Sequence, residues 1–245
     1  MSRETLGVLS ASDTRALRSR RDLQRVNRFL GTRRILVQGI QSEIRRCSRD
    51  LPLRILELGA GDGSLMLRMA QELSRSCPAA QLTLLDRLAL VTADTAAAFA
   101  RLGWAVQMQS VDVLDWARAP LPPHLPLRWD VIVTNLFLHH FDDLLLKELL
   151  SAVAARSNLF VACEPRRTPL SLVGSHLIGA LGASRITRED AVLSVRAGFR
   201  DAELSVLWHG DPGEWQLQEH PIGLFSHFFS ATRRGVTGAE STDAN

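Results

Sequence analysis

Short apolar runs and longer amphipathic segments alternate through most of the chain. Each apolar run is bounded by turn residues and has the length of a buried strand, whereas the segments between repeat their apolar side chains at helical spacing, as at Leu65, Met69 and Leu73. Strands are expected at residues 53–58, 81–86, 105–112, 129–138 and 158–164. Helices are expected directly after the first strand and at residues 88–103 and 142–157. This alternation predicts an α/β fold, with a mostly parallel sheet covered by helices on both faces.

The C-terminal third departs from the alternation. Residues 170–196 are expected to form further helices. Residues 202–208 and 224–231 read as two strands without a clear helix between them, so we expect an antiparallel hairpin at the sheet edge. Residues 210–223 are expected to be the loop of this hairpin, in which Trp215 either stacks on a substrate or covers the sheet edge, the second being favoured.

A glycine-rich loop follows the first strand directly. Gly59, Gly61 and Gly63 occupy alternate positions there. Glycine permits positive φ and lets a ligand approach the backbone, and an open parallel sheet binds its ligands outside the carboxyl ends of its strands. A tight turn without a ligand is the alternative, and three alternating glycines make it the weaker one.

The charges around this loop narrow the class of ligand. The spacing G-x-G-x-G differs from the dinucleotide fingerprint G-x-G-x-x-G, and Asp62 places a negative charge where a pyrophosphate would lie. Glu57 adds a second acid at the end of the strand. A ligand with a positive or zwitterionic group fits these acids better, and S-adenosylmethionine (SAM) has an ammonium group, a sulfonium and no phosphate.

Composition and charge exclude several other classes of protein. The chain has 245 residues, is 46% hydrophobic and carries a net charge of +3, which fits one sizeable globular domain. Nearly all its basic residues are arginine, but acids are interspersed among them, which disfavours a nucleic-acid platform. Three unpaired cysteines, a polar N-terminus and no apolar run of membrane-spanning length lead us to expect a soluble cytoplasmic protein.

The segment ELGAGDG, residues 57–63, resembles the first motif, E/D-x-G-x-G-x-G, of class I SAM-dependent methyltransferases. LFLHHFDD, residues 136–143, is similar to the small-molecule group of that superfamily, which includes the quinone-biosynthesis type. The resemblance covers roughly residues 50–165. It implies a Rossmann-like, doubly wound, seven-stranded and mostly parallel sheet with an antiparallel C-terminal edge strand and N-terminal lid helices.

The resemblance also suggests a division of the chain. The helical N-terminal region, with a break expected at Gly31, would form a lid over the cofactor in residues 1–50. Residues 51–232 would form the methyltransferase domain, and residues 233–245 a flexible tail.

Cofactor-binding positions follow by matching motifs. In the family, an acid at the end of the second strand accepts from both ribose hydroxyls, and Asp86 stands there. Asp112, favoured over Asp115, would meet the adenine amino group, although an Asp after a strand is as often a helix cap. Asn135 and Leu136 would lie beside the methionine portion. The full expected set is Glu57, Gly59, Ala60, Gly61, Gly63, Asp86, Arg87, Asp112, Val113, Asn135 and Leu136.

The expected acceptor site follows the fourth and fifth strands. His139 or His140 could deprotonate a hydroxyl as it attacks the methyl group, with His139 favoured because it is nearer the strand end. The alternative is that one histidine packs or caps a helix and the other faces solvent. The candidate substrate residues are Glu164, Arg167 and His176, for which an Arg–Glu surface pair or core packing is the alternative. No Cys/His cluster indicates a metal.

We therefore expect SAM-dependent methyl transfer to oxygen or carbon of a small aromatic, polyketide or quinone-like acceptor. The expected partners are that acceptor and, as an open option, a second copy in a homodimer, with neither nucleic acid nor a membrane span. One rival is an NAD(P)-dependent Rossmann oxidoreductase. The other is a non-catalytic SAM-binding partner protein, which a closed or solvent-facing arrangement of His139, His140, Glu164 and Arg167 would favour.

Overall fold

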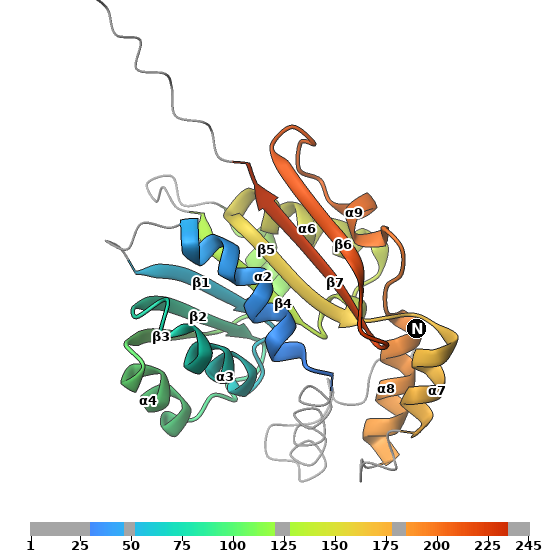
Figure 1. The fold of residues 1–245 in the computed structure, drawn as a ribbon, viewed down its shortest axis with the longest axis horizontal. Coiled ribbons are helices and arrows are strands. Elements are labelled where there is room, and N and C mark those ends of the chain that lie inside the picture. Colours follow the sequence, from blue (N-terminus) through green and yellow to red (C-terminus); the bar gives the residue numbers. More distant parts are fainter. Residues whose placement is uncertain (1–29, 47–51, 121–127, 178–184, 235–245) are drawn as a thin grey trace, which may run out of the picture.

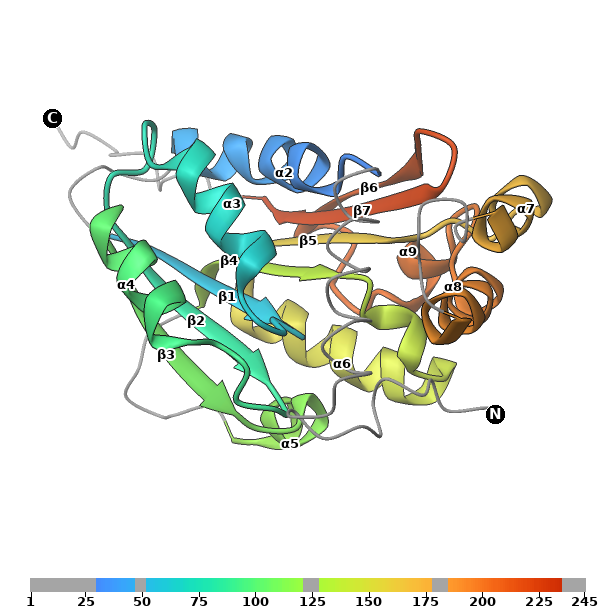
Figure 2. The same cartoon turned by 90° about the horizontal axis from the view of Figure 1, so that it is seen from below.

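The computed structural model describes residues 30–46, 52–120, 128–177 and 185–234, and a seven-stranded sheet runs through them (Figures 1 and 2). In chain order the strands are β1 (Leu53–Leu58), β2 (Ala80–Asp86), β3 (Trp104–Ser110), β4 (Trp129–Asn135), β5 (Ser157–Pro165), β6 (Trp215–Ile222) and β7 (Ser226–Arg233). They lie in the order β3-β2-β1-β4-β5-β7-β6. The first five are parallel, and β7 runs antiparallel between β5 and β6. The doubly wound, mostly parallel sheet expected from the sequence is confirmed.

Helices cover both faces of this sheet (Figure 2). One face carries α2 (Thr32–Arg46), α3 (Ser64–Leu73) and α4 (Ala93–Arg101), and the other carries α5 (Val113–Arg118), α6 (Asp143–Arg156) and α9 (Glu203–Leu207). Beyond the carboxyl end of β5, α7 (Pro169–Leu177) and α8 (Arg185–Ala197) pack against each other (Figure 1). Successive residues of β5 alternate between the two cores, Leu159 and Val161 on one side and Phe160 and Ala162 on the other.

The α2 helix belongs to the core of the sheet. Leu36, Val37 and Ile40 are fully buried, and the helix packs against β4, β5, β7 and α3. Gly31 has a φ of 67° directly before the helix begins, which agrees with a break at this position. The rest of the expected lid, residues 1–29 and 47–50, lies outside the described residues, so the division of the chain into a lid and a catalytic domain stays a prediction.

The two C-terminal segments correct the sequence reading. Residues 202–208, predicted as a strand, contain helix α9, and residues 215–222, predicted as part of a loop, form β6. The spacing of Leu204 and Trp208, both buried, fits one face of a helix as well as it fits a strand. In β6 the inward Trp215 and Leu217 alternate with polar side chains, the pattern of an antiparallel strand with one face on the core and the other toward solvent. The predicted antiparallel hairpin is confirmed, with β6 as its first strand.

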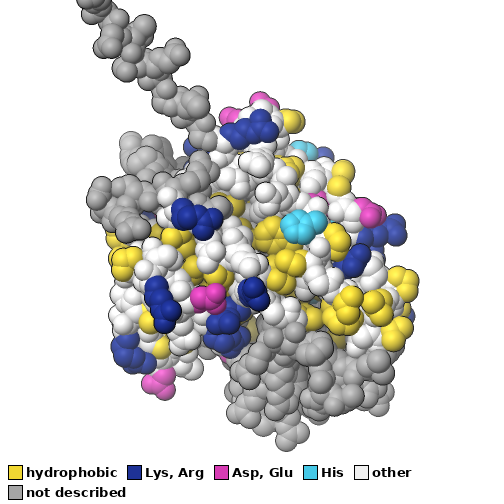
Figure 3. All heavy atoms as spheres, in the orientation of Figure 1, with side chains coloured by type: hydrophobic (Ala, Val, Ile, Leu, Met, Phe, Trp, Pro, Cys, Tyr) yellow, Lys and Arg dark blue, Asp and Glu magenta, His cyan; other side chains and the backbone are white. Residues whose placement is uncertain are grey.

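Two surface features bear on the class of protein. In the part of the chain that the structure describes, no helix combines the length and the apolar character needed to cross a bilayer. On the face shown in Figure 3, basic side chains lie dispersed between apolar and uncharged surface and do not gather in one stripe. Cys77 and Cys163 are buried free thiols, and Cys47 lies outside the described residues.

Candidate active site

The glycine loop lies at the carboxyl end of β1, where the strand order reverses between β1 and β4. Gly59, Gly61 and Gly63 have φ values of 70°, 57° and 73°, which glycine adopts without strain. At Gly59 an added Cβ would lie 2.4 Å from Cδ2 of Phe137. At Gly61 an added Cβ would meet nothing within 4 Å. Gly59 is therefore needed for packing within the protein, whereas Gly61 leaves the backbone bare toward open space.

This difference predicts unequal costs for two matched substitutions. Gly61→Ala is expected to cost about 1–2 kcal/mol of unfolding free energy, the strain of a left-handed backbone at a residue with a Cβ. Gly59→Ala is expected to cost about 1–3 kcal/mol more, because it also forces Phe137 out of its place. Urea denaturation of both variants measures the difference, and an equal loss in the two would contradict the role given to Phe137.

Glu57 is a buried carboxyl group beside this loop. It is 4% exposed, and its Oε2 has no hydrogen-bond partner among the described residues. Burial raises the pKa of Glu57 well above its ordinary value, and the negative charges of Asp62 and Asp86 raise it further. Since buried polar groups are nearly always paired in native proteins, this unpaired oxygen needs an explanation, and a cationic ligand group provides one.

Asp86, the last residue of β2, is hydrogen-bonded to the glycine loop. Its Oδ2 accepts a hydrogen bond from Gly61 N at 2.9 Å, and its Oδ1 accepts one from Leu88 N at 2.9 Å. A shallow hollow adjoins it, with Ala60, Gly61, Asp86, Leu88, Met108 and Ser110 among its lining residues. Arg87 is exposed beside it. Asp86, Gly61 and the hollow thus lie together, as their assignment to one ligand requires.

Asp112 acts as the cap of a helix that the sequence reading missed. Helix α5 begins at Val113, which is buried, and Asp112 Oδ1 accepts a hydrogen bond from Leu114 N at 2.9 Å. The six-residue helix was too short to stand out from the strand before it. The helix-cap alternative for Asp112 is therefore realised, and its contact with an adenine ring stays a prediction.

The turn after β4 has an unusual backbone. Leu136 follows Asn135 with a φ of 50°, a left-handed value that is rare for a residue with a branched side chain, and its N–H donates to the carbonyl of Cys163 at 3.0 Å. Such a conformation persists only where the surrounding structure holds it, and it is common at functional sites. The next residues form a short 3-10 turn, η2 (Leu138–His140).

Glu164 is the group that holds this turn. It is fully buried at the end of β5, and its Oε1 accepts hydrogen bonds from Phe137 N and Leu138 N, both at 3.0 Å. Its Oε2 lies 2.7 Å from Nδ1 of His139, which is also buried. Sequence reasoning placed His139 and Glu164 in one site but treated Glu164 as a substrate contact. The structure makes it the partner of the histidine and of two backbone donors.

The other histidine of the pair, His140, is exposed, and the centroids of the His139 and His140 rings are 4.3 Å apart. It also meets the ring of Phe137 edge-on at 6.1 Å, and Phe137 in turn meets Phe141 at 5.2 Å. The turn therefore presents an aromatic cluster, with His139 on its inner side and His140 on its outer side. Helix α8 packs against this turn.

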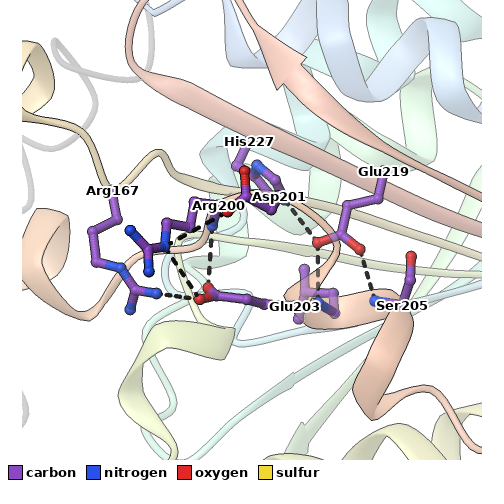
Figure 4. A network of polar contacts seen from close by, with 8 residues as sticks. Arg167, Arg200, Asp201, Glu203, Ser205, Glu219 and His227 are labelled. Atoms are coloured by element: carbon purple, nitrogen blue, oxygen red, sulfur yellow. Dashed lines mark hydrogen bonds and ion pairs between the residues drawn. The ribbon is translucent and has the colours of Figure 1, made fainter.

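The remaining substrate candidates do not join the group. Arg167 forms an ion pair with Glu203 of α9, as the surface-pair alternative foresaw, although with a different glutamate (Figure 4). His176 lies in α7, and its side chain is outside the described part of the structure.

A second histidine–glutamate pair, unforeseen in the sequence, lies beyond Glu203 on the side away from Arg167 (Figure 4). His227 Nε2 and Glu219 Oε1 are 2.8 Å apart, and Glu219 also accepts from Leu204 N and Ser205 N. Burial raises the pKa of Glu219, but the hydrogen bonds from His227 and Ser205 outweigh it and leave this pKa below its ordinary value. This pair fastens α9 to the C-terminal hairpin.

Several solved structures with a similar fold are methyltransferases. The plantazolicin methyltransferase BpumL, in complex with a desmethyl plantazolicin analogue and S-adenosylhomocysteine (SAH), is 15% identical, and the alignment covers 91% of this chain and 93% of that one with a TM-score of 0.60. The SAM-dependent methyltransferase SibL is 16% identical over 95% of this chain and 63% of its own, with a TM-score of 0.57. Magnesium protoporphyrin IX methyltransferase (ChlM) from Synechocystis PCC 6803 with bound SAH is 16% identical over 94% and 91%, with a TM-score of 0.51.

In sequence, no protein-family model matches the chain, and no curated protein does. At identities this low the structural likeness concerns the fold, and it agrees with the strand order and with the expectation drawn from the glycine motif. The chain has the fold of the class I SAM-dependent methyltransferases.

Proposed function

We propose that this protein is a SAM-dependent methyltransferase that acts on a small organic acceptor. The observation that supports it most is the unpaired, buried Oε2 of Glu57 beside the bare backbone of Gly61. The charges of Asp62 and Asp86 act on this same carboxyl group. Such a cluster suits the ammonium group of an amino acid, which SAM carries next to its sulfonium.

The same acids disfavour a dinucleotide. A pyrophosphate would bring negative charge close to Asp62 and Asp86, whose charges already raise the pKa of Glu57. These two carboxylates would repel the phosphates, and the helix N-terminus behind the loop would have to overcome that repulsion. An NAD(P)-dependent oxidoreductase is therefore the weaker proposal.

The residues present fit the parts of SAM in turn. Glu57 would accept from the ammonium group, and Asp86 would accept from the ribose hydroxyls. Asp86 already accepts one N–H at each oxygen, and a carboxylate oxygen has a further lone pair for a hydroxyl donor. Asn135 and Leu136 would border the methionine portion. The cofactor supplies a methyl group that is activated by its sulfonium, and the protein has to align the acceptor and remove its proton.

His139 is the proposed base. The Glu164 carboxylate at 2.7 Å favours a proton on Nδ1 of His139, which leaves Nε2 as the basic nitrogen. As the acceptor atom forms its bond to the methyl carbon, the carbon–sulfur bond breaks, its electron pair stays on sulfur, and the acceptor proton passes to Nε2. Glu164 stabilises the imidazolium that results. Its two backbone hydrogen bonds keep the carboxylate in place during this transfer.

The acceptor we propose carries a hydroxyl or an acidic carbon on an aromatic, polyketide or quinone-like framework, as in secondary metabolites. The exposed ring of His140 next to Phe137 offers a flat surface for such a molecule. The similar structures include the methyltransferase domain of the citrinin polyketide synthase, 16% identical over 80% of this chain and 52% of its own, with a TM-score of 0.51. A screen of phenols, β-dicarbonyl compounds and hydroquinones for acceptor-dependent SAH formation tests the proposal.

A second candidate is a SAM-binding protein without transferase activity. The burial of His139 against Glu164 favours it, since this is the closed arrangement expected of such a protein. A base held by a buried carboxylate is equally the arrangement that proton transfer requires, so we place catalysis first. SAH binding combined with no turnover across the acceptor screen would favour the second candidate.

Glu57→Gln is expected to stabilise the ligand-free protein near neutral pH and to weaken SAH binding about 10- to 100-fold, through loss of a charged hydrogen bond. Because the pKa of Glu57 is raised on folding, the native state holds a proton that the unfolded state has lost. Wild-type stability should therefore fall as the pH rises from the ordinary glutamate pKa of about 4.3 toward the raised value. The variant lacks this fall, and the two proteins should converge below that range.

Urea denaturation at a series of pH values, from the ordinary glutamate pKa of about 4.3 to above neutrality, measures the effect on stability. Calorimetric SAH titrations at neutral pH measure the effect on binding. Glu72→Gln, on the exposed side of α3, is the matched control. A Glu57→Gln protein that is less stable than the wild type and binds SAH normally would show that Glu57 has a structural role only.

A further inference from the structure

Phe137 takes part in both halves of the proposed site. Its ring lies on Gly59, where an added Cβ would be 2.4 Å from Cδ2. Its backbone N–H donates to Glu164 Oε1 at 3.0 Å. One residue thus contacts the loop proposed to hold the cofactor and the carboxylate that holds the proposed base.

The contacts continue without a gap from Gly59 to His139. Glu164 Oε1 is shared by the N–H groups of Phe137 and Leu138, and Oε2 of the same carboxylate lies 2.7 Å from Nδ1 of His139. A carboxylate is planar and rigid, so a movement of its Oε1 donors that turns the group also moves Oε2. The orientation of the imidazole therefore depends on the position of Phe137.

The turn that carries Phe137 is restrained on both sides, so a movement of the Phe137 ring also moves the backbone of the turn. Leu136, directly before it, has a left-handed φ of 50°, and its N–H is tied to the carbonyl of Cys163. On the other side the ring of Phe137 packs edge-on against Phe141. The left-handed conformation of Leu136 is maintained only by the residues packed around it. A shift of those residues therefore changes the conformation of the turn as well.

We propose that Phe137 is a positioning residue that transmits the occupancy of the glycine loop to His139. A cofactor on the loop fixes Gly59, Gly59 fixes the Phe137 ring, and the Phe137 backbone sets the carboxylate that orients the base. The inference rests on the proposed function, since it takes SAM or SAH as the occupant of the loop. It predicts that the turn after β4 tightens when the cofactor is bound, before any acceptor arrives.

Amide hydrogen exchange, followed by NMR with and without SAH, tests the transmission. In the wild type, SAH is expected to slow exchange at the Phe137 and Leu138 amides about tenfold beyond the general slowing in the core of β1, within the ~5- to 150-fold that coupled sites usually show. Phe137→Leu keeps the backbone N–H donor but loses the ring that packs on Gly59. The extra slowing of exchange at the residue 137 and Leu138 amides should therefore disappear in this variant. Phe99→Leu, a matched change at a buried phenylalanine of α4 whose ring stacks on Trp104, should retain the extra slowing.

Phe137→Met is a second variant, with a side chain of about the same volume as leucine but unbranched and more adaptable in shape, and it should show the same loss of the extra slowing. An equal extra slowing in the wild type and in both Phe137 variants would overturn the inference, and so would no extra slowing in the wild type. Calorimetry on the same samples separates the two proposals. If the wild type does not bind SAH, the proposed function fails and the inference with it, whereas SAH binding without the extra slowing defeats the inference alone.

Discussion

His139→Gln is expected to lower kcat about 10²- to 10⁴-fold, the usual contribution of a general base, while SAH binds as tightly as to the wild type. Glutamine places its amide group near the position of the imidazole Nε2, where it cannot take up the acceptor proton. It also gives up the contact of Nδ1 with Glu164 Oε2 at 2.7 Å. Cofactor binding is unaffected because the imidazole is assigned to the acceptor and not to the cofactor.

His140→Gln is the matched control, since His140 is the neighbouring histidine and is exposed. It is expected to change the apparent acceptor affinity and to leave kcat within a few-fold of the wild type. Steady-state kinetics with the best acceptor from the screen, together with SAH calorimetry, measures both variants. If His139→Gln retains full turnover, transfer proceeds by alignment alone or uses another base. If His140→Gln shows the large loss instead, the two roles are reversed.

Asp86→Ala is expected to abolish measurable SAM binding. The substitution removes the acceptor proposed for the two ribose hydroxyls, and each hydrogen bond to a charged group contributes about 1.5–3 kcal/mol, so affinity should fall about 10²-fold or more. It also releases Gly61 N and Leu88 N, which donate to Asp86 at 2.9 Å, and so loosens the loop itself. Both effects act in the same direction.

Asp86→Asn separates these two effects, because an amide oxygen can still accept from one backbone N–H while the charge is gone. Asp94→Ala is the neutral control, since Asp94 lies exposed in the first turn of α4. Calorimetric titration of SAM and SAH into each variant gives the dissociation constants. Unchanged SAM affinity in Asp86→Ala would remove the assignment of the ribose site.

The central strands could be predicted because both of their faces are buried. β1, β4 and β5 are covered by helices on each side, so they read as continuous apolar runs with clear ends. β6 was not predicted from the sequence, because Gln216 and Gln218 face outward and the strand has no continuous apolar run. Helix α9 was not predicted either, because its first turn is held by Glu219 of β6, which accepts hydrogen bonds from Leu204 N and Ser205 N. No local pattern in the sequence records that contact.

Some residues of the candidate site could be predicted from the sequence and others could not, for the same reason. The glycines and Asp86 could be found because motif and backbone geometry depend on neighbours in the chain. The role of Glu164 could not, since its three donors come from residues 137–139, on a different strand's turn. Phe137 carried no signal at all, because its contact with Gly59 exists only after β1 and β4 have paired.

Whether the glycine loop binds SAM decides the proposed function. Isothermal titration of the wild-type protein with SAM, SAH and NAD in parallel measures this. We expect micromolar binding of SAM and SAH and no binding of NAD, because the Glu57 carboxyl group suits an ammonium group and the charges of Asp62 and Asp86 repel a pyrophosphate. Binding of NAD without SAM or SAH would contradict the proposed SAM site and support an oxidoreductase.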